Sequence, residues 1–231
     1  MVELPLPLIS GGLQTIADFL TTLASSREII GGLFRGHTEI GHRPLPKAFR
    51  DRGSHLRTAE QLELWKKFIS RVSPVRPAND MEYLVLAQHY GVVTALLDWT
   101  SNPLVAMFFS CSGNQDVDGV IWGLRSFFMN EFREPIDFDL FEETRDAPIL
   151  VDAGAMNPRS KIQHSMMTLH TLNETEPNMW EVFTIPAARK IGTLHALERF
   201  GINAESIFDD PALAAKSFQE GILSDPFDPF G

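Results

Sequence analysis

Cysteine is almost absent from this chain of 231 residues, which has a single one, Cys111. One cysteine cannot form an intramolecular disulfide or a cysteine-rich zinc site. The seven histidines show no spacing typical of metal ligands, so we expect no metal centre. Cys111 ends an apolar segment and has no evident neighbouring base, which favours packing over a nucleophilic role.

Long apolar runs and early positive charges are also lacking. No lysine or arginine precedes Arg27, whereas a secretory signal has positive charge before its apolar core. No apolar run approaches the roughly 18 residues that a membrane-spanning helix needs. The sequence therefore predicts a cytoplasmic protein without membrane association. Its formal net charge of −10 disfavours broad, non-specific nucleic-acid binding, which requires a positive surface.

Several common enzyme motifs are missing as well. The chain has no glycine-rich phosphate loop ending in Lys-Ser/Thr, no Gly-x-Ser-x-Gly turn and no His-Glu-x-x-His segment. These absences argue against a kinase, a serine hydrolase of the usual kind and a zinc protease.

Hydrophobic periodicity and capping residues predict the secondary structure. Thr58 with Gln61 forms a capping-box pattern, Asp80 is suited to cap the next helix, and Asn102-Pro103 is a strong helix start. The predicted helices are 12–25, 58–71, 80–91, 103–109 and 186–200, the last with Ile191, Leu194 and Leu197 inside, and a short helix opening at Asp210-Pro211. The predicted strands are 33–35, 119–124, 161–172 and 180–185, with an irregular excursion over 126–158.

Helices first and strands later, without strand–helix alternation, favour an α+β fold. We expect a single domain with a helical N-terminal half and a small, mostly antiparallel sheet. Along the chain, residues 1–26 are expected to form an N-terminal helical segment, 27–220 the domain and 221–231 a tail.

Arg35 is the most informative charged residue. It follows an apolar strand and precedes Gly36, whose missing side chain lets a ligand or another backbone approach closely. A guanidinium at this place can bind phosphate or carboxylate through two parallel hydrogen bonds. The alternative is a structural arginine paired with a buried acid such as Asp98.

A second set of candidates surrounds the end of the predicted helix 80–91. His89 can donate a hydrogen bond or exchange a proton, or simply cap the helix. Tyr90 lies on the same helical stripe as Tyr83, so core packing is its alternative role. Asp98 follows two leucines, and its carboxylate can anchor Arg35, cap backbone amides or face a substrate.

The late strands supply two further candidates. Gln163 belongs to a polar cluster with Arg159, and the alternative for both is a solvent-facing strand position. Strict alternation places Glu181 on the same side as Phe183 and Ile185, which is unusual for a solvated glutamate.

Residues 86–109 read LAQHYGVVTALLDWTSNPLVAMFF, and Phe34-Arg35-Gly36 precedes them by some fifty residues. This combination resembles the FRG domain, a bacterial and phage-associated family found with mobile elements and with defence or toxin-like genes. The chain departs from the family pattern at Val93-Thr94-Ala95, where Pro-Thr-Arg is common, and at Ser165 and Met167, where glycine and phenylalanine are usual.

The pattern of an early strand arginine, a His-Tyr pair and a late strand glutamine also resembles ADP-ribosyltransferase folds. That resemblance implies NAD as the substrate, with Arg35 on the diphosphate and an aromatic ring, Tyr90, on nicotinamide. It also implies a carboxylate near a ribose hydroxyl, for which Glu181 is the nearest candidate.

Three interpretations of the polar residues remain open. The first is an NAD-using transferase or glycohydrolase, in which His89, Tyr90, Gln163 and Glu181 act in catalysis and Arg35, Gly36 and Asp98 bind the nucleotide. The second is a non-catalytic module that binds a phosphate-bearing ligand or a partner protein. The third is a purely structural polar core with a buried pair of Arg35 and Asp98.

Overall fold

The computed structural model describes residues 6–26, 32–41, 44–50, 58–74, 76–124, 130–131, 148–151, 165–170 and 179–208. The described helices are α1 (Leu6–Ser25), α2 (Lys47–Arg50), α3 (Ala59–Val72), α4 (Asp80–His89), α5 (Pro103–Cys111), α7 (Ala187–Glu198) and α8 (Ala204–Phe208). The described strands are β1 (Leu33–His37), β2 (Leu96–Thr100), β3 (Gly119–Leu124), β4 (Asn130–Glu131), β5 (Ile149–Val151), β6 (Ser165–Leu169) and β7 (Met179–Ile185).

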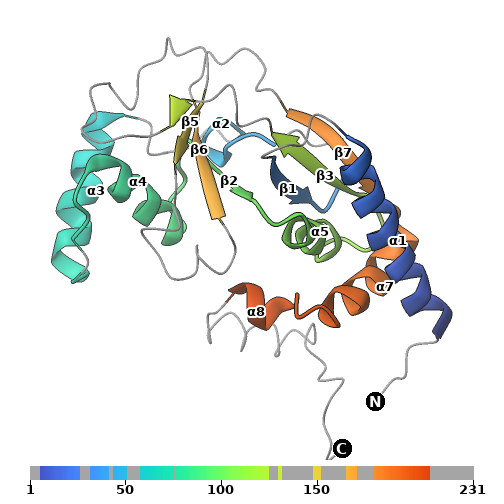
Figure 1. The fold of residues 1–231 in the computed structure, drawn as a ribbon. Coiled ribbons are helices and arrows are strands. Elements are labelled where there is room, and N and C mark those ends of the chain that lie inside the picture. Colours follow the sequence, from blue (N-terminus) through green and yellow to red (C-terminus); the bar gives the residue numbers. More distant parts are fainter. Residues whose placement is uncertain are drawn as a thin grey trace, which may run out of the picture.

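The strands form one sheet in the order β4-β5-β6-β2-β1-β3-β7 (Figure 1). Every neighbouring pair is antiparallel except β4 and β5, which are parallel. The predicted α+β fold with a mostly antiparallel sheet is therefore confirmed. None of the described helices is both long and apolar enough to cross a membrane.

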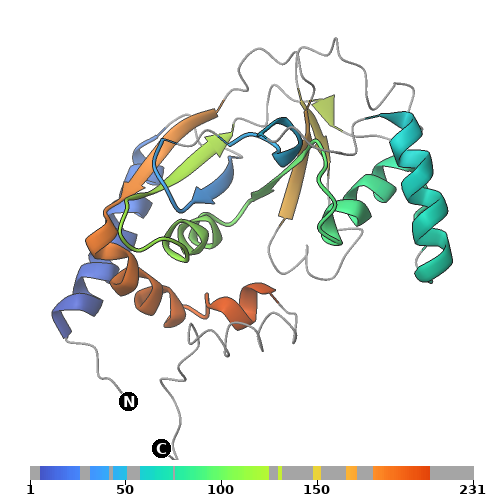
Figure 2. The same ribbon diagram turned by 180° about the vertical axis from the view of Figure 1, so that it is seen from behind.

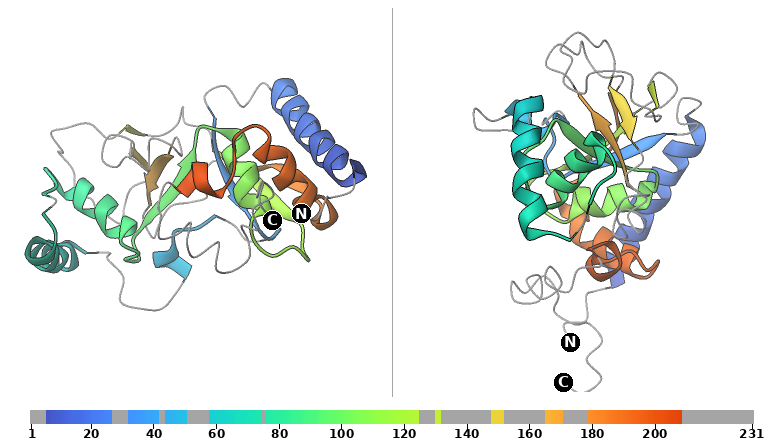
Figure 3. Two further views of the ribbon diagram at one scale, coloured as in Figure 1. Left: turned by 90° about the horizontal axis from the view of Figure 1, so that it is seen from below. Right: turned by 90° about the vertical axis from the view of Figure 1, so that its left-hand side faces the viewer.

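Helices cover the two halves of the sheet separately. The β1-β3-β7 half packs against α1, α5 and α7, whose shared cluster includes Phe34, Ile121 and Ile185. The other half packs against α3 and α4 through Leu96, Leu169 and Ile149. Seen from behind and from below, α3 lies at one end of the molecule, and α1 and α7 lie at the other (Figures 2 and 3).

The two halves meet at a short junction between β1 and β2. These strands share one registered pair, Phe34 opposite Thr100, whereas β1 and β3 share five. Beyond that pair, α5 approaches β1 so closely that a Cβ on Gly36 would lie 1.9 Å from the carbonyl oxygen of Ala106. The missing side chain of Gly36 therefore lets the backbone of α5 approach β1, which is one of the two roles predicted for this glycine; the other was close approach of a ligand.

A buried lysine fixes the end of β1. Lys190 of α7 is fully buried, and its Nζ donates hydrogen bonds to the carbonyl oxygens of Thr38 (2.7 Å) and Asn114 (2.6 Å). Burial lowers the pKa of Lys190, because the charged form loses solvation that the nearby acids only partly replace. These bonds tie α7 to the residue that follows β1 and so help position the strand that carries Arg35.

Several helices begin or end where local sequence patterns predicted. The capping box of Thr58 and Gln61 is present, and Asn102 caps α5 ahead of Pro103. Gly91 and Gly201 follow α4 and α7 with φ of +80° and +74°, as expected for helix-stopping glycines.

Other expectations about the elements were wrong. The side chain that caps α4 is that of Asn79, which accepts a hydrogen bond from the amide of Glu82, and Asp80 is the first helical residue. Helix α1 starts six residues earlier than predicted, and β2 was not predicted as a strand. Of the three core positions predicted in α7, Leu197 is fully buried, whereas Ile191 is 45% exposed because it lies on the side away from the buried Lys190, Thr193 and Leu197. The predicted helix at Asp210-Pro211 lies outside the described residues.

Candidate functional site

Three chemically distinct side chains lie in a row across the β1-β3-β7 half of the sheet. Arg35 of β1 is registered opposite Trp122 of β3, and Trp122 is registered opposite Glu181 of β7. Residues directly opposite each other in antiparallel strands point to the same face. We call Arg35, Trp122 and Glu181 the three-strand row. Adjacent strands lie about 4.8 Å apart, so the Cα atoms of Arg35 and Glu181 are separated by about 10 Å.

Arg35 is placed at the junction where the two halves of the sheet diverge. Its Nη1 donates a hydrogen bond of 2.7 Å to the backbone carbonyl of Asp98 on β2. The side chain as a whole is partly exposed, while its Nε is buried. An anchored guanidinium presents its other N–H groups in a fixed direction, which suits recognition of phosphate or carboxylate.

The indole N–H of Trp122 is a hydrogen-bond donor that lacks an acceptor in the part of the chain that the structure describes. Its indole Nε1 is buried and has no hydrogen-bond partner among the residues that the structure describes. Buried donors are almost always satisfied, so this one marks a position that a ligand oxygen or a water molecule can occupy. Trp122 was not predicted as a site residue, because its position depends on the register of β3 against β1 and β7, which no local sequence pattern contains.

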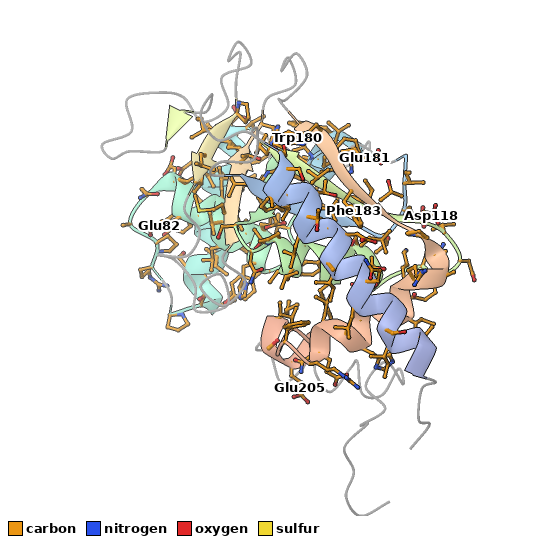
Figure 4. The ribbon with its side chains drawn as sticks, turned by 45° about the vertical axis from the view of Figure 1, so that its right-hand side comes forward. Glu82, Asp118, Trp180, Glu181, Phe183 and Glu205 are labelled. Atoms are coloured by element: carbon orange, nitrogen blue, oxygen red, sulfur yellow. The ribbon has the colours of Figure 1, made fainter. Side chains whose placement is uncertain are left out.

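Glu181 reaches the row because β7 contains an irregularity. The pairing between β3 and β7 shifts register, with Ile121 opposite Phe183 but Trp122 opposite Glu181. The extra residue breaks the alternation, so the prediction that Glu181 shares a face with Phe183 was wrong. Phe183 joins the helix-covered cluster, while Glu181 is exposed and accepts a hydrogen bond of 2.5 Å from the Thr184 hydroxyl. Figure 4 shows Glu181 on β7, the edge strand of the sheet.

Gln88, Thr94 and Asp98 of the FRG-like block form a second polar cluster close to the junction between β1 and β2. The side-chain amide of Gln88 donates to the Asp98 carboxylate (2.9 Å), and Thr94 donates to the Gln88 carbonyl oxygen (2.5 Å). The Asp98 side chain is exposed. By register it shares a face with Thr100 and Phe34, opposite to Arg35. Asp98 therefore contacts Arg35 through its backbone carbonyl, and its carboxylate is not sealed from solvent with the guanidinium.

His89 and Tyr90 lie at the C-terminal end of α4 and are exposed. The Tyr90 ring is 5.4 Å from the His89 ring and 6.4 Å from the Trp65 ring of α3. Neither residue belongs to the three-strand row. Gln163 and Arg159 lie outside the described residues.

The remaining titratable candidates do not suggest metal or thiol chemistry. The part of the chain that the structure describes holds no group of three or more His, Cys, Asp or Glu residues arranged to bind a metal. Cys111 is fully buried, and desolvation raises its pKa to about 12. Cys111 packs in the cluster that α1, α5 and α7 share with the sheet, so its predicted packing role is confirmed.

Comparison with known protein families adds to this geometry. Residues 31–119 match the family model described as the FRG domain. The chain contains an FRG domain. No curated protein and no solved structure matches the chain. The matched residues include Arg35 and the whole second polar cluster, whereas Trp122 and Glu181 follow the end of the FRG match.

Proposed function

We propose that this FRG-domain protein is an NAD-using enzyme of the ADP-ribosyltransferase or NAD glycohydrolase type. The observation that carries the proposal is the three-strand row, which aligns a cation, an indole N–H and a carboxylate on one face of the sheet. NAD offers a matching set of groups: an anionic diphosphate, flat rings with polar edges, and ribose hydroxyls. The resemblance of the chain to ADP-ribosyltransferases supports the same assignment.

In this proposal the diphosphate binds at Arg35. The guanidinium is held by the Asp98 carbonyl at Nη1, so binding requires little further ordering of its side chain. Asp98 thus acts through its backbone, and Gly36 acts by placing β1 against α5. The Trp122 indole N–H donates to an oxygen of the same nucleotide, which removes the cost of a buried unsatisfied donor.

Glu181 supplies the negative charge that glycosidic cleavage requires. The bond between C1′ of the ribose and the nicotinamide nitrogen breaks, and nicotinamide leaves with the bonding electron pair as a neutral molecule. Positive charge then develops at C1′ and the ring oxygen, where a nearby carboxylate is stabilising. Water or an acceptor hydroxyl forms the new C1′–O bond and releases one proton. His89, Tyr90 and Gln163 stay predicted catalytic residues, with the Tyr90 ring against nicotinamide, and a defence or toxin setting stays an implication of the family.

The test is nicotinamide release from NAD by the purified chain, with water or added acceptors. We expect Glu181→Gln to lower the release rate by about 100-fold or more, because the amide cannot stabilise the developing charge. NAD affinity, measured by calorimetry, should change only a few-fold. Glu205→Gln is the matched control, since Glu205 is an exposed glutamate on α8 (Figure 4). Wild-type protein that releases no nicotinamide with any acceptor, or a Glu181→Gln variant as active as wild type, would refute the proposed reaction.

A second candidate is a recognition module that binds a phosphate-bearing ligand without turnover. It is favoured by the two donors of the row, Arg35 and Trp122, which suit a phosphate whether or not a reaction follows. This module would be stabilised thermally by NAD or ADP-ribose and would release no nicotinamide. The Glu181→Gln variant would then bind as wild type does, so the same assay separates the two functions.

A further inference from the structure

Helix α3 exposes a stripe of large apolar side chains. Leu64, Phe68 and Val72 recur every fourth residue, and they are 65%, 61% and 67% exposed. Residues four apart lie on the same side of a helix. The helix packs on the domain through another side, which carries the buried Leu62 and Ile69. The exposed stripe is therefore not needed for the packing of α3 itself.

The apolar surface continues from α3 to the end of α4. The ring of Trp65 stacks on Phe68 at 6.3 Å and lies 6.4 Å from the ring of Tyr90, which is 54% exposed. The Trp65 indole donates a hydrogen bond to the Tyr83 carbonyl, which fixes its ring. We call Leu64, Trp65, Phe68, Val72 and Tyr90 the α3 patch. It lies at one end of the molecule (Figures 1 and 3), and a contiguous apolar surface of this kind marks an interaction site.

Charges beside the stripe are segregated along the helix. The exposed acids Glu60 and Glu63 lie in its first half, and the exposed bases Lys67 and Arg71 lie in its second half. Glu60, Lys67 and Arg71 have no ion-pair partner within the described parts of the chain. Two such helices in antiparallel orientation place the acids of each beside the bases of the other. A parallel pairing would place like charges together, which is unfavourable.

We propose that the α3 patch binds a second copy of this chain through an antiparallel contact between the two α3 helices. With the two-fold axis near Lys66, Leu64 of each copy faces Phe68 of the other, and Glu60 lies beside Arg71 of the other. Such a contact is isologous, since each copy contributes the same surface. One helix pair gives a small interface, so the dimer has a dissociation constant in the micromolar range or weaker. This inference does not depend on the proposed enzymatic activity.

Sedimentation equilibrium of the full chain over a concentration series tests the dimer. Wild-type protein should shift from monomer to dimer as concentration rises, and Phe68→Asp should remain monomeric. Phe68 is exposed, so its replacement should leave the fold intact, as circular dichroism can verify. Ile191→Asp is the matched control, because Ile191 is an exposed apolar residue on α7 and should leave dimerisation unchanged.

Charge exchange tests the antiparallel orientation directly. Glu60→Lys or Arg71→Glu alone should weaken the dimer by several-fold, because each creates like charges across the contact. The double variant Glu60→Lys/Arg71→Glu should restore wild-type association. Protein that is monomeric at every concentration would overturn the proposal and leave the patch to a different occupant. A double variant weaker than either single variant would overturn the antiparallel arrangement.

Discussion

Replacement of Arg35 by alanine is expected to reduce nicotinamide release by about 100-fold or more. The guanidinium is the cation of the three-strand row, and its loss removes the charge and the N–H groups that we propose bind the diphosphate. Arg35→Lys should recover part of the activity, because the charge remains while the planar fork is lost. Unlike Glu181→Gln, Arg35→Ala should also weaken NAD binding, measured by calorimetry.

Arg35 also has a structural contact, so the experiment needs a control for stability. Its Nη1 donates to the Asp98 carbonyl, and loss of that bond should cost about 1–3 kcal/mol of unfolding free energy. Arg76 is the matched control, because its guanidinium donates to the carbonyl oxygens of Ser70 and Ser73. Arg76→Ala loses comparable bonds and should keep full activity. Equal activities of the Arg35→Ala and Arg76→Ala variants would show that Arg35 does not act on the nucleotide.

Gly36→Ala should cause the largest loss of stability among the substitutions considered. The added Cβ would lie 1.9 Å from the carbonyl oxygen of Ala106 and 2.6 Å from the amide nitrogen of Ser110. Both atoms belong to the backbone of α5 and cannot rotate away, so β1 and α5 must separate. We expect a loss of about 3 kcal/mol or more. For a chain of this length, that corresponds to a fall in Tm of about 10 °C in a thermal melt.

Gly91→Ala is the control that distinguishes a steric clash, expected for Gly36→Ala, from backbone strain alone. Gly91 has φ of +80°, and a Cβ there would meet nothing within 4 Å. Its replacement by alanine should lower the unfolding free energy by only about 1 kcal/mol, the strain of holding a residue with a Cβ in the left-handed backbone conformation. If Gly36→Ala proves no more destabilising than Gly91→Ala, the close contact between β1 and α5 is not a constraint on this fold.

Features encoded by neighbouring residues could be predicted from the sequence. The capping box at Thr58, the Asn102-Pro103 helix start and the glycine stops act within one helical turn, so they are visible in the sequence. The α+β class followed from the order of such elements. β2 was missed because Leu96–Thr100 mixes apolar and polar residues without clean alternation, and its strand form depends on pairing with β6.

The candidate site depended on contacts that local patterns do not specify. Arg35 could be selected because a charge between an apolar strand and a glycine is conspicuous. Trp122 could not, since its importance comes from its register opposite both Arg35 and Glu181. The orientation of Glu181 was predicted incorrectly, because strict alternation cannot anticipate the irregularity in β7.

The most direct test of the proposed site is the NMR signal of the Trp122 indole N–H during an NAD titration. Trp65 and Trp99 already donate to Tyr83 and Thr168, whereas the buried Trp122 donor has no partner in the described structure. We expect NAD to shift the Trp122 signal, assigned with Trp122→Phe, and to leave those of Trp65 and Trp99 nearly unchanged. A Trp122 signal that does not move at NAD concentrations up to about 10 mM, above the usual range of KM, would contradict the site.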